Sequence, residues 1–354
     1  MGKVKIHHKI SKNNIVLISG VALFVVMMIC LGLGRFSVPV FQTFKIIVNW
    51  IVSGIGNLFS SNIGLKQTWS DQMSSVILTV RLPRVLGAAL IGAALALSGA
   101  TYQGVFKNPL VSPDLLGVSN GACVGAAFAI LCGLPSLGIQ MCALVMGLLT
   151  VFITTIIPKF FKNNSSLMLV LSGVIVSGFM SAVLGMATYV ADPDDELGDI
   201  VYWMMGSLSG VRMRDVLIVA PAMIAALIVL IMLRWRVNLL SLGDKEAKSL
   251  GVNVPRVRNL TILCSTVLTA CSICLCGTIG WIGLVVPHFS RIIIGQDNRF
   301  LMPMSAILGA ILMVLVDTVS RNLTGSEIPL SIITGVIGAP LFLFLLVVQH
   351  TRIE

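Results

Sequence analysis

The sequence predicts an all-α, polytopic membrane protein with about ten transmembrane helices. Two observations predict this fold class. Hydrophobic residues make up 56% of the 354 residues, charged residues make up only 11%, and the mean hydropathy is +1.00. A soluble domain of this length needs much more charge to cover its surface. Uncharged runs close to the roughly 20 residues that a helix needs to cross a bilayer also recur along the whole chain.

Eight uncharged runs give the predicted spans in chain order. They are 15–34, 85–106, 115–158, 165–191, 216–233, 259–290, 300–316 and 328–351. The run 115–158 is long enough for two passes with a break at 133–136, and 259–290 for two passes with a turn near 277–280. A helical bundle is expected because every backbone polar group must be satisfied inside lipid. The runs also do not alternate as barrel strands do.

Basic residues set the predicted orientation. The N-terminus carries Lys3, Lys5, Lys9 and Lys12, which favours the cytoplasm, and ten passes then bring the C-terminus to the same side. On this map sixteen of the 24 lysines and arginines fall inside and eight fall outside. The net charge of +10 therefore reflects topology. We expect no nucleic-acid partner, because no binding motif accompanies these scattered basic residues.

Residues 1–354 are predicted to form one transmembrane domain without a soluble domain. Residues 35–80 are expected to be an external linker, and their moderately apolar part 38–59 leaves open an interfacial or a capping position. Residues 192–214 are expected outside as an acidic turn and a short helix. The largest loop predicted on the cytoplasmic side is 234–258.

The loop 234–258 carries signals for two short helices. Ser241 stands three residues before Asp244, as at the start of a capping box. Asp244 and Lys248 have the i,i+4 spacing of a helical ion pair. Gly251 is placed to end this first helix, and Pro255 is a favourable first residue for a second one that runs into the membrane.

Several motifs together resemble one family. They are Arg81-Leu-Pro-Arg84, Gln103-Gly-Val-Phe-Lys-Asn-Pro-Leu110, Leu116-Gly-Val-Ser-Asn-Gly-Ala122, Leu242-Gly-Asp244 with Ala247 and Leu250-Gly-Val252, Gly280-Trp-Ile-Gly with Pro287-His288, Asp317-Thr-Val-Ser-Arg321 and Thr334-Gly-Val-Ile-Gly-Ala-Pro340. The chain resembles the permease subunits of type II ABC importers, which take up iron–siderophore complexes, haem and vitamin B12. The matches reach from residue 81 to the C-terminus, whereas residues 1–80 match only in layout.

This resemblance implies a permease of the bacterial inner membrane that moves an iron–siderophore, with haem or vitamin B12 as alternative cargoes. It also implies three partners: two copies of a cytoplasmic ABC ATPase, an extracytoplasmic substrate-binding protein, and a second permease copy or a paralogue. The chain itself is not expected to be an enzyme or to hold a cofactor, because it has no phosphate-binding loop of the form Gly-x-x-x-x-Gly-Lys-Ser/Thr. In the family the segment that matches the 234–258 loop couples to the ATPase, which nominates Leu242, Gly243, Asp244, Ala247, Leu250 and Gly251.

Three arginines are the candidates for docking the binding protein. On the predicted map Arg81, Arg84 and Arg321 all lie at the outer membrane surface, where an anionic partner is needed to relieve their repulsion. In the resembled family, arginines at these positions receive glutamates from the binding protein, and a guanidinium binds a carboxylate bidentately. Anchoring to lipid phosphates is the alternative, and Asp317, four residues before Arg321, is placed to pair with it.

The substrate path is predicted along the dimer axis. By resemblance, the helix at about 167–190 and the outer ends near the last predicted helix line it. Gly173, Ser177, Gly178 and Ser181 give the helix at 167–190 a small, mildly polar face. Packing against a neighbouring helix is an equally good explanation of this face.

Other polar residues in the spans support weaker alternatives. An ion-coupled secondary transporter would use intramembrane carboxylates, for which Asp317 is the best candidate. We expect His288 to be structural, and we expect Cys271, Cys274 and Cys276 to pack between helices, because no further ligands for a metal accompany them.

Overall fold

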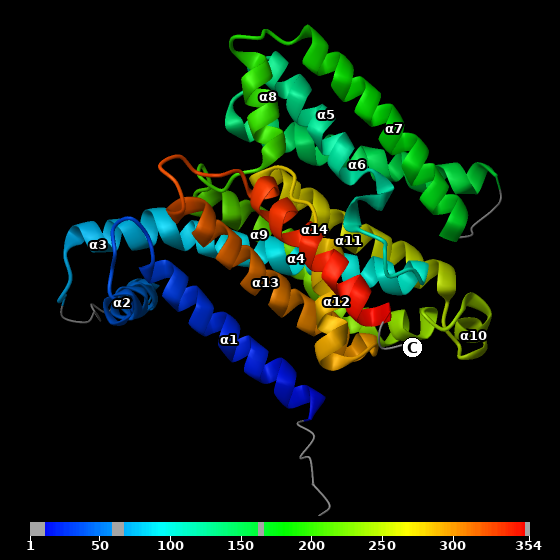
Figure 1. The fold of residues 1–354 in the computed structure, drawn as a ribbon, viewed down its shortest axis with the longest axis horizontal. Coiled ribbons are helices and arrows are strands. Elements are labelled where there is room, and N and C mark those ends of the chain that lie inside the picture. Colours follow the sequence, from blue (N-terminus) through cyan, green and yellow to red (C-terminus); the bar gives the residue numbers. More distant parts are fainter. Residues whose placement is uncertain (1–10, 59–66, 162–165, 351–354) are drawn as a thin grey trace, which may run out of the picture.

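The computed structural model describes residues 11–58, 67–161 and 166–350, and these form helices and loops without any strand (Figure 1). Helices long and apolar enough to cross a membrane are α1 (Lys12–Gly32), α4 (Leu82–Phe106) with the segment before it, α6 (Ser136–Phe160), α7 (Ser166–Val190), α9 (Met213–Leu240), α11 (Val254–Cys276) and α13 (Asn298–Asn322). Shorter apolar helices are α5 (Val118–Leu131), α12 (Ile282–Ile294), α14 (Leu330–His350) and, within the predicted linker, the first part of α2 (Val40–Leu58). Each of the ten predicted spans therefore contains a helix.

The second span begins earlier than predicted. A short helix α3 (Asp71–Ser75) and a π-helical segment η1 (Val76–Arg81) continue without a break into α4. Residues 71–80 of the expected external linker are thus helical and continuous with the second span, while residues 59–66 lie outside the described residues. The physical reason is that charge did not end the helix: the Arg81 side chain is buried and hydrogen-bonded inside the protein.

The moderately apolar part of the linker forms the helix α2 (Val40–Leu58). Figure 1 shows α2 end-on, whereas α1, α4 and α13 run along the plane of the view. It packs against α1 and η1. A helix inclined so steeply to its neighbours fits an interfacial position better than an additional pass.

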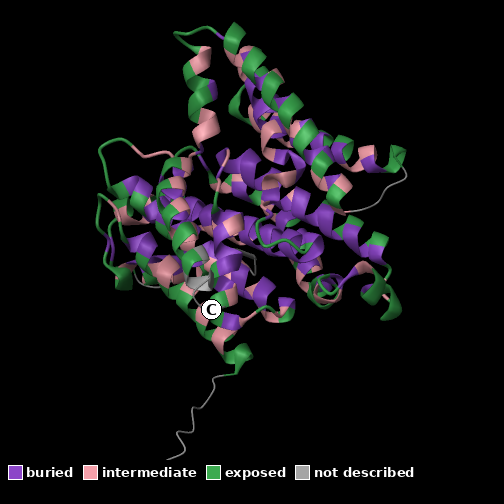
Figure 2. Ribbon diagram, turned by 45° about the vertical axis from the view of Figure 1, so that its right-hand side comes forward, coloured by how far each residue is buried: buried purple, intermediate pink, exposed green. Residues whose placement is uncertain are grey.

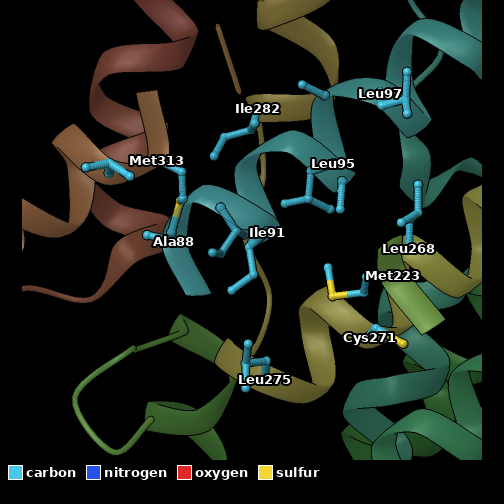
Figure 3. Packing of buried hydrophobic residues seen from close by; sticks show 14 of the residues in the cluster. Ala88, Ile91, Leu95, Leu97, Met223, Leu268, Cys271, Leu275, Ile282 and Met313 are labelled. Atoms are coloured by element: carbon cyan, nitrogen blue, oxygen red, sulfur yellow. The ribbon is translucent and has the colours of Figure 1, made fainter. Parts of the chain in front are cut away.

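Helix α4 is the centre of the bundle. It contacts α9, α11, α12 and α13. Most of the span Asp71–Phe106 is buried, whereas most of α1 is not, and Figure 2 shows buried residues concentrated in the interior of the bundle. Figure 3 shows Ile91 and Leu95 of α4 among side chains of α9, α11, α12 and α13. Burial on every side explains why α4 carries apolar residues all around its circumference.

Two glycines of α4 permit close approach of neighbouring backbones. A Cβ on Gly92 would collide with the carbonyl of Gly309 in α13, and a Cβ on Gly99 would collide with that of Gly283 in α12. Packing of small residues replaces the hydrophobic effect as the force that joins helices in lipid. These glycines therefore mark the places where α4 crosses α13 and α12.

Helices α5, α6, α7 and α8 (Glu196–Met205) form a group beside the rest of the bundle (Figure 1). The 3₁₀ turn η2 (Pro113–Leu116) leads into this group from α4, and α6 packs along α11 of the other group. The short helix predicted within 192–214 is confirmed as α8. It begins at Glu196, whose carboxylate accepts a hydrogen bond from the Asp192 N–H (3.0 Å).

Candidate functional site

Polar residues collect at the two opposite ends of the bundle. At one end, Arg35 donates hydrogen bonds to the carbonyls of Thr324 (2.6 Å) and Gly325 (2.5 Å), joining the end of α1 to the loop after α13. At the other end, the guanidinium of Arg234 donates to the Arg299 carbonyl (3.1 Å), joining the end of α9 to the start of α13. We call these the Arg84 end and the α10 end, after the feature that dominates each. The predicted topology likewise places Arg35 on one side of the membrane and Arg234 with Arg299 on the other.

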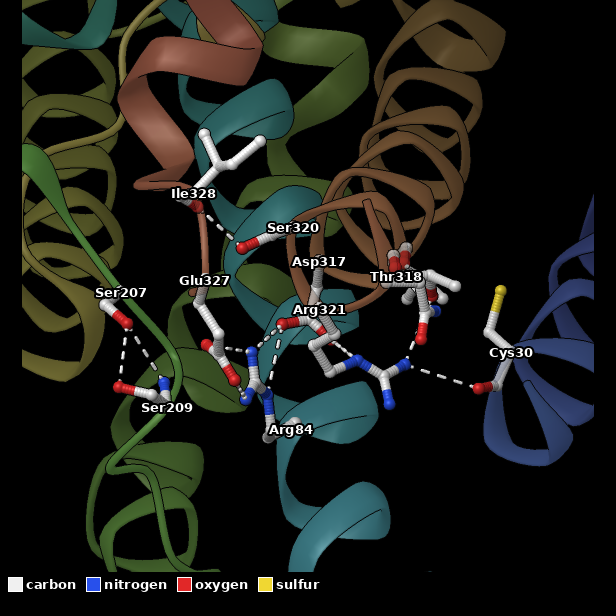
Figure 4. A network of polar contacts seen from close by, with 12 residues as sticks. Cys30, Arg84, Ser207, Ser209, Asp317, Thr318, Ser320, Arg321, Glu327 and Ile328 are labelled. Atoms are coloured by element: carbon white, nitrogen blue, oxygen red, sulfur yellow. Dashed lines mark hydrogen bonds and ion pairs between the residues drawn. The ribbon is translucent and has the colours of Figure 1, made fainter. Parts of the chain in front are cut away.

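The Arg84 end contains a buried ion-pair network (Figure 4). The guanidinium of Arg84 in α4 contacts the carboxylate of Asp317 in α13 (2.8 Å) and that of Glu327 in the loop before α14 (2.6 Å). The side chains of Arg84 and Asp317 are only 4% and 0% exposed, whereas that of Glu327 is 28% exposed. The network thus ties together three segments that are far apart in the sequence.

Arg321 and Arg81 are also held from inside. Arg321 forms an ion pair with Asp317 (3.1 Å) and donates a hydrogen bond to the Cys30 carbonyl (3.3 Å) in α1. The guanidinium of Arg81 donates to the carbonyls of Leu31 (2.9 Å), Gly32 (3.0 Å) and Phe36 (2.5 Å). Both arginines therefore fasten the end of α1 to the bundle.

These contacts correct the expected setting of the docking candidates. Arg81, Arg84 and Arg321 are buried instead of standing on the surface. Arg84 and Arg321 pair with carboxylates, and Arg81 bonds to backbone carbonyls. The pairing of Asp317 with Arg321, predicted from the i,i+4 spacing, is confirmed. The part played by Glu327 was missed because it lies 243 residues from Arg84 and no local pattern joins the two.

The α10 end is organised by a carboxylate of the predicted coupling loop. Helix α10 (Asp244–Ser249) begins at Asp244, which forms an ion pair with Arg258 of α11 (2.8 Å) and another with Lys107 (3.6 Å). Partial burial would raise the pKa of Asp244, but hydrogen bonds and charge from Arg258, aided by Lys107, outweigh this and lower the pKa below its ordinary value.

Details of the loop differ from the sequence prediction. Asp244 pairs with Arg258 and Lys107 instead of Lys248, because α11 passes directly beside α10. Ser241 does not cap α10, since its hydroxyl donates to the Asn238 carbonyl (2.7 Å) at the end of α9. The predicted second helix is the first part of one continuous α11, which has its proline near the start as expected.

The six coupling candidates divide into buried and exposed residues. Ala247 is 0% exposed and packs in the core below α10, and Gly243 is also buried. Leu242 and Leu250 are 63% and 58% exposed, although both are apolar. Gly251 has a φ of +79°, which suits glycine and ends the short helix. Only Leu242 and Leu250 therefore present large apolar surface to a partner.

The four path candidates in α7 also divide. Gly173 presses against the carbonyl of Leu115 in η2, and the Ser177 carbonyl accepts a hydrogen bond from the Asn120 amide (3.1 Å). Gly178 and Ser181 are exposed, and a Cβ on Gly178 would meet nothing within 4 Å. Packing thus explains the first pair, while the second pair faces away from the chain.

His288 and the three cysteines of α11 lie in packed surroundings. The Nε2 of His288 lies 3.1 Å from the Pro109 carbonyl, and its ring meets Phe342 edge-on. The thiols of Cys271, Cys274 and Cys276 are buried, and Cys276 donates to the Ser272 carbonyl (3.1 Å). These contacts fit the structural parts expected for the four residues.

Comparison with known proteins points to a single family. The family model described as the FecCD transport family matches residues 21–348. The molybdate import system permease protein MolB of Haemophilus influenzae is 39% identical over 320 residues, which are 90% of this chain and 91% of the relative. The hemin transport system permease protein HmuU of Yersinia pestis is 37% identical over 310 residues, or 84% and 92% of the two chains.

A solved structure extends the likeness to the fold. A metal-chelate type ABC transporter in an inward-facing conformation superposes with a TM-score of 0.82 at 37% sequence identity. The superposition covers 94% of this chain and 99% of the other. Nearly the whole helical arrangement is therefore shared.

Proposed function

Because this chain belongs to the FecCD transport family of ABC importer permeases, we propose that it moves an iron–siderophore or a related metal chelate across the inner membrane. The observation that carries this proposal is the likeness, over 94% of the chain, to a metal-chelate type transporter. Molybdate is the second candidate cargo, because a relative named for molybdate import is 39% identical. Relatives named for haem and vitamin B12 keep these two cargoes as further alternatives.

The ATPase is proposed to dock at the α10 end, which we place in the cytoplasm. Leu242 and Leu250 supply exposed apolar anchors on either side of α10, and apolar anchors in a polar rim are typical of protein interfaces. Ion pairs from Asp244 to α11 hold α10 against the bundle. A push on α10 would therefore be transmitted directly to a membrane helix.

The binding protein is proposed to dock at the opposite, Arg84 end. Arg81, Arg84 and Arg321 remain candidates through the family resemblance, but burial changes the geometry that docking requires. A carboxylate of the partner would have to replace Glu327, the more exposed of the two carboxylates on Arg84. Lipid anchoring remains the alternative for these arginines.

The substrate path is proposed between two permease copies. Gly178 and Ser181 of α7 support this proposal, because both are exposed in the single chain and present little bulk. A second copy opposite them would enclose a passage lined by small residues. Gly173 and Ser177 would then hold this wall against η2.

Transport by the whole importer tests the cargo. Proteoliposomes with the permease, its ATPase and its binding protein should accumulate a radiolabelled iron–siderophore only when ATP is enclosed. Molybdate, haem and vitamin B12 are measured in parallel as competitors. Uptake of molybdate but not of the iron chelate would assign the second candidate cargo, and uptake driven by an ion gradient without ATP would contradict the proposal.

Replacement of an exposed leucine tests the coupling surface. Leu250→Glu should lower the ATPase activity of the assembled complex at least tenfold, because a charge replaces an apolar anchor at the interface. Leu134→Glu is the matched control, since Leu134 is also exposed (42%) but lies in the turn between α5 and α6. Equal activity of the two variants would show that α10 is not the coupling element.

A further inference from the structure

An apolar groove of about 900 Å³ runs between α6 and α11 and reaches Arg258 beside the α10 end. Its walls include Val145, Leu149 and Phe152 of α6 and Ile262, Leu263 and Val267 of α11. Leu169 at the start of α7 also lines it. The side chains of Leu149, Phe152 and Leu263 are 43%, 60% and 58% exposed, so the groove is open along its side.

The groove is apolar along its length and polar at one end. Helices α6 and α11 run in opposite directions, so that Val145 and Val267 lie at one end and Lys159 lies with Arg258 and Asn259 at the other. In Figure 1 the latter ends of both helices point towards α10. The groove thus combines an apolar channel with a cluster of hydrogen-bond donors.

The dimensions of the groove match one leaflet of a bilayer. At 1.5 Å per residue, the wall from Val145 to Lys159 is about 21 Å long. A bilayer with its headgroup regions is about 40–45 Å thick, so half of it has nearly the same length. An amphiphile of one leaflet would therefore fill the groove from its chain ends to its headgroup.

The charge at the polar end selects an anion. Asp244 is the carboxylate that pairs with both Arg258 and Lys107. Lys159, which is exposed, adds a third cation. One negative charge therefore faces three positive charges, and the net charge of these four groups is positive. Asn259, also exposed, adds an amide donor. Basic pockets between transmembrane helices on the cytoplasmic side bind anionic lipid headgroups.

We propose that this groove binds one anionic phospholipid, with its acyl chains between α6 and α11 and its phosphate at Lys159, Asn259 and Arg258. Arg258 also holds α10 through Asp244, so the lipid contacts the residue that joins the coupling helix to the bundle. The assignment to the cytoplasmic leaflet rests on the proposed function, whereas the site itself does not.

Native mass spectrometry of the purified permease tests the charge selection. We expect dioleoyl phosphatidylglycerol to bind more tightly than dioleoyl phosphatidylcholine. Lys159→Ala should weaken the phosphatidylglycerol complex about fivefold, the effect of one basic residue near a headgroup, and leave phosphatidylcholine binding unchanged. Arg236→Ala, which removes an exposed cation outside the groove, should change neither. Equal binding of both lipids to the wild type would overturn the proposal.

Blocking the groove tests the location. Leu263→Trp should reduce binding of both lipids, because the indole fills the channel, while Ile228→Trp on the exposed face of α9 should not. Each variant must elute from size exclusion as the wild type does. Phosphatidylglycerol binding that survives Leu263→Trp would place the lipid elsewhere. The assay needs neither ATPase nor binding protein, so its failure is distinguishable from a failure of ATP-driven uptake.

Discussion

The ion pairs of the Arg84 end and those of the α10 end join the same residue types in different surroundings. At the Arg84 end, Arg84 and Asp317 are 4% and 0% exposed and lie among packed helices. At the α10 end, Asp244 is 42% exposed, and its partners Lys107 and Arg258 are 39% and 9% exposed. Water is excluded from the Arg84–Asp317 pair, whereas it still reaches the Asp244 carboxylate, although its partner Arg258 is only 9% exposed.

This difference determines what each set contributes. Removing one partner of a buried pair leaves an uncompensated charge in a medium that cannot solvate it. Removing one partner of an exposed pair leaves a charge that water and salt still screen. The Arg84 end is therefore expected to hold the fold together, and the α10 end is free to exchange partners.

The largest expected effect follows from the loss of Asp317. Asp317→Asn should destabilise the permease by about 3–5 kcal/mol, because both Arg84 and Arg321 lose their shared buried carboxylate. Thermal unfolding in detergent measures this loss. The double variant Arg84→Met with Asp317→Leu should recover part of it by removing both members of the pair. A loss below 1 kcal/mol for Asp317→Asn would contradict the distinction between the two ends.

A smaller effect is expected for the second carboxylate on Arg84. Glu327→Ala should cost about 1.5–3 kcal/mol, the range for a hydrogen bond to a charged group, because Asp317 still neutralises the arginine. Unfolding of this variant is compared directly with that of Asp317→Asn. If the two variants were equally unstable, the network would depend on Glu327 as much as on the fully buried carboxylate.

The smallest effect is expected at the α10 end. Asp244→Asn should cost about 1 kcal/mol at pH 7, because water reaches the 42% exposed Asp244 carboxylate even though Arg258 is buried, and high salt should reduce the difference from the wild type. The pKa of Asp244 is lower in the folded protein, so its pairs stabilise above the unfolded pKa of about 3.9, and this stability is lost as the pH falls through the lowered value. Unfolding of both proteins at pH 7 and below pH 4 checks this sign, and a difference that grew on acidification would refute it.

The sequence by itself determined the helical class, the order of the apolar segments and the grouping of charged residues at two ends. These follow from local physics: lipid demands long uncharged helices, and a run such as 85–106 carries that information without reference to any other segment. The close contact of Gly92 with Gly309 was also foreseeable, because small residues mark helix crossings in membranes. The family resemblance added the partners, which composition alone does not reveal.

Only the tertiary structure decided which charges meet. Arg84 is 233 residues from Asp317 and 243 from Glu327, and no periodicity relates positions so far apart. The same limitation explains Asp244, which had a suitable partner at i,i+4 but pairs with α11, because the packing of α10 brings Arg258 closer. Local spacing shows which pairs are permitted. The arrangement of the helices selects among them, because a charge taken out of water must find its partner wherever the fold places one.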